Sequence, residues 1–170
     1  MKIKDKMFLI PAGCILIIAF MYSIWRVFFI PTGAMEPTIP KGSKLISQRY
    51  VFSSPKRGDV VIFSTENIKY GDSGLMGKNY IKRLIGLPGD TVEIKKGKLI
   101  INSVEYESEI YYTIPKPYES PYINSQRPVI MIPADHYFVL GDNSENSLDS
   151  RYFGPIPAQN IWARMIYLLK

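Results

Sequence analysis

The chain has 170 residues, which suffices for one domain with a core, with or without a membrane anchor, and excludes two full-sized domains. Hydrophobic residues make up 46% of the chain, and 13 prolines and 12 glycines favour a loop-rich β protein over a helical bundle. The net charge of +6 comes from scattered basic residues without a nucleic-acid motif, so we expect no nucleic-acid partner, and an anionic membrane surface accounts for the charge at least as well.

The N-terminal part of the chain carries a long apolar stretch. Residues 7–30 contain only a few polar side chains, and at about 1.5 Å per helical residue they can cross a hydrocarbon core of roughly 30 Å. We expect a single membrane-spanning helix here, with Trp25 at the far interface. The lysines of residues 1–6 predict a cytoplasmic N-terminus and place residues 31–170 on the outer side of the plasma (inner) membrane. A cleaved signal peptide is the alternative, but no clear cleavage site follows the stretch.

The rest of the chain consists of short β-rich runs separated by turns. Val, Ile, Tyr and Phe dominate the runs, and Gly, Pro, Ser and Lys dominate the intervals, which is typical of strands in a mainly β protein. No helix is expected after residue 30, so the fold class is an all-β domain, a folded sheet or partial barrel. The expected strands cover residues 45–46, 50–52, 59–63, 80–85, 91–95, 99–103, 129–132, 136–140 and 161–169.

One segment interrupts this β pattern. Residues 105–128 are rich in Tyr, Pro, Ser and Glu and show no sustained periodicity. Together with the hairpin that precedes them, whose turn is Lys96-Gly97-Lys98, they form an expected surface excursion from about residue 96 to residue 130. The excursion belongs to the single β domain of residues 31–170.

The rare residue types restrict the chemistry. Cys14 is the only cysteine, so no internal disulfide and no cysteine metal site can form. His136 is the only histidine, which excludes histidine triads and multi-histidine zinc sites. We therefore expect neither a metal nor a cofactor, and we interpret His136 as a structural residue at the start of a strand.

A lysine in the expected strand 80–85 is a candidate general base. Alternation places Lys82 on the face of Leu84 and Arg83 on the opposite face. A buried amine whose pKa is lowered toward neutrality can accept the proton of a serine hydroxyl, whereas a guanidinium cannot deprotonate. Taken alone, the strand favours the alternative of a solvated lysine at a sheet edge.

Three sequence boxes give this lysine a context. Residues 31–38 (PTGAMEPT), 80–90 (YIKRLIGLPGD) and 141–151 (GDNSENSLDSR) resemble, in this order, the nucleophile, lysine and C-terminal boxes of bacterial type I signal peptidases. The resemblance extends from the apolar stretch to the last strand. It implies a membrane-bound serine endopeptidase that removes N-terminal signal peptides from secreted preproteins by a Ser/Lys dyad.

The resemblance also implies roles for individual residues. Ala34 occupies the position of the family's nucleophilic serine, and Lys82 that of the general base. The hydroxyl of Thr32 and the main-chain amide of residue 34 correspond to the oxyanion-hole donors. Ser147 corresponds to the residue that hydrogen-bonds and orients the lysine amine.

The same box contains three further matching positions. They are Asp142, Asp149 and Arg151. An ion pair between Asp149 and Arg151 would fix the loop that carries Ser147, so we expect these residues to support the site rather than to act on substrate. Met35 is expected to line the substrate cleft or to contact lipid, with plain core packing as the alternative.

The alanine at position 34 predicts a chain that does not cleave, because a methyl group cannot attack a carbonyl. The expected partners are membrane lipid and secretory preproteins with small residues before the cleavage site, bound in extended form. We interpret Ala34 as an engineered replacement of serine, because the neighbouring positions match the family. The alternatives are a natural non-catalytic relative that binds preproteins or a pilus or sortase partner, and a conjugation-pilus maturation protease.

Overall fold

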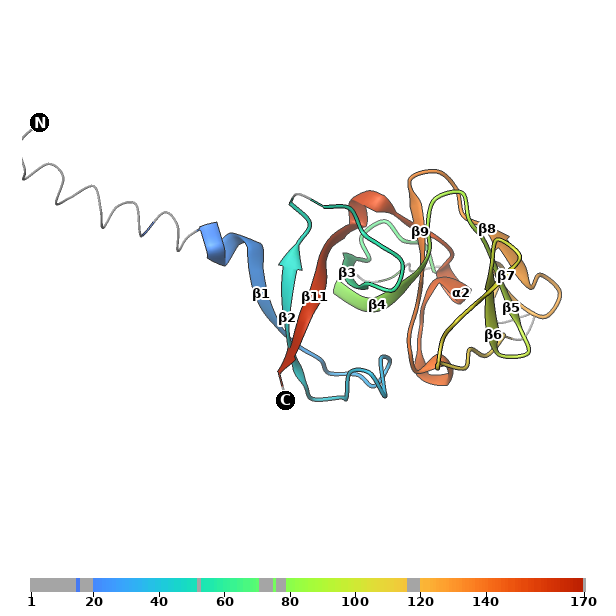
Figure 1. The fold of residues 1–170 in the computed structure, drawn as a ribbon, viewed down its shortest axis with the longest axis horizontal. Coiled ribbons are helices and arrows are strands. Elements are labelled where there is room, and N and C mark those ends of the chain that lie inside the picture. The colour runs from blue at the N-terminus through green and yellow to red at the C-terminus, as the bar shows by residue number, and fades with distance from the viewer. Residues whose placement is uncertain are drawn as a thin grey trace, which may run out of the picture.

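The computed structural model describes residues 15, 20–51, 53–70, 75, 79–115 and 120–169. Strands dominate these residues and form two antiparallel sheets. The smaller sheet lies at the end of the domain away from β1 (Figure 1). The expectation of a mainly β domain is confirmed.

The larger sheet has seven strands and carries most of the sequence boxes. In spatial order they are β1 (Trp25–Phe29), β2 (Lys44–Arg49), β11 (Ile161–Leu169), β3 (Val60–Ser64), β4 (Asn79–Gly86), β9 (His136–Leu140) and β10 (Ile156–Pro157). Register shifts interrupt the long strand β11 where it pairs with β2 and with β3. Such irregularities bend a strand and increase its twist, which allows the sheet to curl.

The smaller sheet combines strands of the expected excursion with the strand that precedes it, β5. Its order is β7 (Val104–Tyr106), β6 (Lys98–Ile101), β5 (Thr91–Lys95) and β8 (Val129–Met131). The β5–β6 hairpin turns at Lys96 and Gly97, which both have positive φ. Within residues 107–128 the described part contains no strand, as expected, but the excursion as a whole is more regular than the sequence suggests.

The side chains between the sheets form the core that holds the site in place. Ile85 and Phe138 of the larger sheet pack with Val92 and Ile94 of the smaller one. A separate cluster joins the turn after β1, through Met35, to β2, β3 and β11. The first of the three sequence boxes is therefore fixed to the larger sheet by apolar contacts.

Short helices lie near the C-terminal box, so the expectation of no helix after residue 30 is wrong. They are the 3₁₀ turns η1 (Ser144–Asn146) and η2 (Ala158–Asn160) and the single turn α2 (Ser150–Phe153). The Asp149 side chain caps α2 by accepting a hydrogen bond from the Arg151 amide. Four residues are too few to give a helical periodicity that a sequence pattern could reveal.

The end of the expected membrane helix has a different structure. Residues 20–24 are helical, but Trp25–Phe29 is strand β1 and pairs with β2. Aromatic and β-branched residues suit an edge strand, and Phe28 packs against Trp162 of β11. Residues 1–14 and 16–19, where most of the expected anchor falls, lie outside the described residues. Among the described residues, no helix is long and apolar enough to span a bilayer.

The structure also bears on the expected strand at residues 50–52 and on His136. Tyr50 and Val51 lie outside any strand, because the Tyr50 amide bonds to the Trp162 carbonyl and its hydroxyl to Asp59. His136 begins β9, as expected, and its ring lies 2.9 Å from the Ala134 carbonyl oxygen.

Candidate active site

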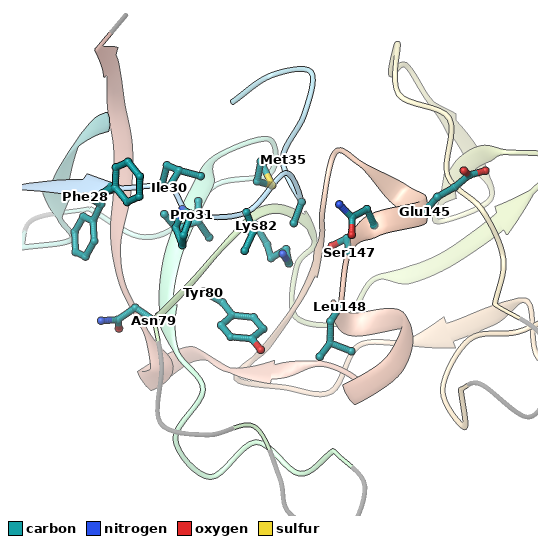
Figure 2. Close-up of a pocket in the computed structure, with 15 residues that line it drawn as sticks. Phe28, Ile30, Pro31, Met35, Asn79, Tyr80, Lys82, Glu145, Ser147 and Leu148 are labelled. Carbon is teal, nitrogen blue, oxygen red and sulfur yellow. The ribbon is translucent and has the colours of Figure 1, made fainter. Parts of the chain in front are cut away.

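A cavity of about 620 Å³ opens between the turn after β1, strand β4 and the C-terminal box. We call it the cleft (Figure 2). Apolar side chains such as Phe28, Ile30 and Leu148 form much of its wall. All three sequence boxes contribute residues to it, although they are far apart in the chain.

The first box supplies the floor of the cleft through a tight turn. Ala34 is 8% exposed and lines the cleft with Thr32. Among the described residues, the Ala34 amide donates to no backbone carbonyl. The two residues expected to supply the oxyanion donors therefore both lie at the cleft. Met35 is buried and packs in the core, as in the alternative stated above, and it also lines the cleft.

The second box supplies a buried amine. Lys82 is 5% exposed and extends from β4 into the cleft (Figure 2). Burial lowers the pKa of Lys82 to about 8, while the nearby Asp149 carboxylate opposes this effect and the Arg151 guanidinium adds to it. Burial dominates because a charged amine loses its hydration inside the domain. Near neutral pH a usable fraction of Lys82 is therefore unprotonated, as a general base requires.

The neighbouring arginine faces the other way. The Arg83 guanidinium donates to both carboxylate oxygens of Asp142, at 2.8 and 2.5 Å, and to the Gly58 carbonyl at 2.9 Å. It is not part of the cleft wall. Asp142 thus links the strand that carries Lys82 to the C-terminal box from behind the cleft.

The third box contains a second, fully buried ion pair. The Arg151 guanidinium donates to both carboxylate oxygens of Asp149, at 2.8 and 2.7 Å, and neither side chain is exposed. Asp149 also accepts a hydrogen bond from the Gly141 amide at 3.0 Å, and Arg151 donates to the Ser144 carbonyl at 2.8 Å. The pair therefore ties together both ends of the loop that carries Ser147.

Ser147 lies at the cleft but lacks the expected hydrogen bond. Its side chain is buried, and its Oγ has no hydrogen-bond partner among the described residues, so it does not bond to Lys82 here. A buried hydroxyl without a partner is rare. In sites without substrate, catalytic hydrogen bonds are often long and tighten when substrate binds.

The sequence comparisons agree with this arrangement of boxes. A family model described as signal peptidase, peptidase S26, matches residues 3–169. The chain belongs to this family. It is 39% identical over 141 residues to signal peptidase I of Leptolyngbya laminosa, covering 81% of this chain and 65% of the relative. It is 36% identical over 143 residues to the probable signal peptidase I-2 of Synechocystis sp., covering 80% and 59%.

The chain spans less than two thirds of the length of these two signal peptidase relatives. A crystal structure of a signal peptidase I from Enterococcus faecalis aligns with 64% of this chain and 94% of that chain, at 31% identity and a TM-score of 0.47.

Some residues of this signal peptidase cleft were not singled out from the sequence. Tyr80 lines the cleft two positions before Lys82, and the Lys82 amine lies 5.6 Å from the centre of its ring. The strand alternation that selected Lys82 could have identified Tyr80 as well. Asn143 bonds to the turn that carries Ala34, and no local pattern in the sequence signals this contact. Among the described residues, no group of His, Cys, Asp and Glu side chains is arranged to hold a metal ion.

Replacing Lys82 with methionine is expected to raise the free energy of unfolding at pH 7 by roughly 1–3 kcal/mol, because a pKa lowered from 10.5 to about 8 means that the folded state disfavours the charged amine. Between these two pKa values the unfolded chain binds more protons than the folded one, so parent stability rises with pH and the advantage of Lys82→Met shrinks. Urea unfolding of parent and variant in detergent from pH 7 to 10.5 measures the difference. A pH-independent difference would contradict this assignment.

Proposed function

We propose that this chain is a membrane-bound signal peptidase of the Ser/Lys type that binds secretory preproteins but does not cut them. The observation that carries the proposal is a buried lysine, with its pKa lowered to about 8, in the same cleft as a methyl group at position 34. In this proposal Lys82 is the base, Thr32 and the residue-34 amide are the oxyanion donors, and the attacking atom is what the cleft lacks.

The residues of the cleft define what a serine at position 34 would do. Lys82 would accept the hydroxyl proton as the oxygen attacks the scissile carbonyl. The residue-34 amide and the Thr32 hydroxyl would donate to the oxyanion that forms. Ser147 would orient the lysine, and Asp142, Asp149 and Arg151 would hold the loop in place. This division of roles follows the family resemblance and fits the positions of the side chains.

The substrate class follows from the family resemblance, and the wall of the cleft is compatible with it. The apolar side chains of this wall suit small residues, such as alanine, at the first and third positions before the cut, presented by an extended peptide. We place the chain in the plasma membrane as a single-pass protein, with its N-terminus in the cytoplasm and the cleft outside. The apolar stretch of residues 7–24 and the lysines before it support this topology.

The origin of Ala34 separates two forms of this proposal. An engineered replacement makes the chain an inactive form of a peptidase, whereas a native alanine makes it a binding protein for preproteins or for a pilus or sortase partner. Retention of Lys82 and Ser147 favours the first, because a binding protein does not need a base. Sequencing codon 34 in the source gene decides between them.

A binding experiment tests the proposal directly. The full chain in detergent is expected to bind a signal-peptide fragment with alanine at the first and third positions before the cut, and mass spectrometry should find the fragment intact after overnight incubation. The same fragment with tryptophan at both positions should bind at least about tenfold more weakly, because the family resemblance implies a preference for small residues at these positions. Equal affinity for the two fragments, or cleavage by the parent chain, would count against the proposal.

A further inference from the structure

Asn143 connects the C-terminal box to the turn that carries position 34. Its backbone N–H donates to the Ala34 carbonyl at 3.1 Å, and its side-chain Nδ2 donates to the Gly33 carbonyl at 3.0 Å. One residue thus holds two successive carbonyls of a turn that lies 110 positions away in the chain. The Gly33 carbonyl also accepts a bond from the Glu36 amide at 3.1 Å, within the turn itself.

The direction of the Ala34 amide follows from this contact. The peptide unit between Gly33 and Ala34 is planar and trans, so its C=O and its N–H point in opposite directions. Asn143 and Gly33 are not part of the cleft wall, whereas Ala34 and Thr32 are. Asn143 lies at a neighbouring hollow on the other side of the turn. Because Asn143 holds the C=O from outside the cleft, the Ala34 N–H is directed toward the cleft.

We propose that Asn143 is a positioning residue for the oxyanion hole, through the peptide unit that joins residues 33 and 34. Its side-chain amide fixes the orientation of the residue-34 N–H, and its hydrogen bond to the C=O of the same peptide makes that N–H a stronger donor. A preorganised donor stabilises the negative charge that develops in the transition state. The inference rests on the proposed function, because it assigns part of the same site.

The packing around Asn143 explains why the two loops keep this arrangement. A Cβ atom added to Gly141 would lie 2.6 Å from the Ala34 carbonyl oxygen and 2.0 Å from the Ser147 Oγ. Only glycine therefore allows the C-terminal box to approach the turn so closely. The close approach at Gly141 and the hydrogen bond from the Glu36 amide remain when the Asn143 side chain changes. Loss of the Asn143 side-chain hydrogen bond should therefore tilt the peptide unit without unfolding the turn.

The variant Asn143→Asp tests the side-chain bond with almost no change in shape. It keeps the backbone bond to Ala34 and replaces the donor to the Gly33 carbonyl with an acceptor. In the Ala34→Ser background, we expect kcat to fall about ten- to hundredfold. This is a smaller loss than the roughly 10²–10³-fold fall in kcat that follows complete removal of an oxyanion donor. KM should stay within about twofold, because ground-state binding is unaffected. The pH midpoint should rise slightly, because the added carboxylate lies next to Asp142, whose charge already raises the pKa of Lys82. The matched control, Asn67→Asp, changes an exposed asparagine after β3 that does not line the cleft and should leave kcat unchanged.

A second readout does not depend on activity. In the parent chain in detergent micelles, NMR should detect a through-hydrogen-bond coupling between Asn143 Nδ2 and the Gly33 carbonyl carbon, together with a residue-34 amide shift that changes in Asn143→Asp but not in Asn67→Asp. An absent coupling or an unchanged kcat would overturn the positioning role. An inactive Ala34→Ser chain would instead count against the proposed function, and the coupling would still decide whether Asn143 holds the turn.

Discussion

Replacing Ala34 with serine is expected to raise the rate of preprotein cleavage at least about 10⁴-fold over the parent chain. Removing the nucleophile of a serine protease abolishes nearly all of its rate advantage, because the members of the site act as a unit. Lys82, Thr32 and residue 34 already line the cleft, so in the proposed mechanism the serine restores the single missing part. Single-turnover cleavage of a preprotein in liposomes, followed by gel and mass spectrometry, measures the gain.

The control for this prediction uses two lysines. In the serine background, Lys82→Met should return cleavage to the parent level, whereas Lys95→Met, which removes an exposed strand lysine, should leave it unchanged. Arg83→Met, the control that strand alternation suggests, is unsuitable, because it would leave the buried Asp142 carboxylate without its partner. A serine form that is folded and binds the peptide fragment but cleaves nothing would refute the prediction.

The same enzyme form should show a simple pH dependence. Lys82 acts as a base only when it is neutral, and burial lowers its pKa to about 8. Below that pH the charged form dominates, so kcat/KM should fall about tenfold for each pH unit and should level off above the midpoint. A pH–rate profile between pH 5.5 and 10 measures the midpoint in the free enzyme.

The sequence predicts the parts of the site that depend on local periodicity. The opposite orientations of Lys82 and Arg83 follow from the two-residue repeat of a strand. The depth at which Lys82 is buried does not, because β9, which pairs with β4 on the side away from β3, comes from a distant part of the chain. The ion pair of Asp149 and Arg151 could be expected from two charges close together in a turn-rich run.

Other features depend on partners that no local pattern reveals. The apolar stretch predicts a helix up to residue 30, but pairing with β2 makes Trp25–Phe29 a strand. The expected bond between Ser147 and Lys82 came from the resemblance alone, and the structure places the two side chains in one cleft without joining them. Asn143 is one of several Asn and Asp residues in a turn-rich box, so only the folded chain distinguishes it from ordinary turn residues.

Asp149→Ala is expected to lower the free energy of unfolding by about 3–5 kcal/mol, because it leaves the fully buried Arg151 guanidinium without its counter-ion. It also removes the acceptor of the Gly141 amide. In contrast, Glu105→Ala breaks the exposed ion pair with Lys98, whose side chains are 57% and 63% exposed. That change should cost less than about 1 kcal/mol, because water and salt screen exposed charges.

Chemical denaturation of the full chain in detergent measures both variants, and a double-mutant cycle with Arg151→Met isolates the pair. Removing both charges should lower the free energy of unfolding by less than the sum of the two single changes, because the double variant leaves no buried charge without a partner. Additive costs, or a loss for Asp149→Ala no larger than for Glu105→Ala, would show that the pair does not hold the loop. Because that loop carries Ser147, Asp149→Ala in the serine background should lose activity even at temperatures where it stays folded.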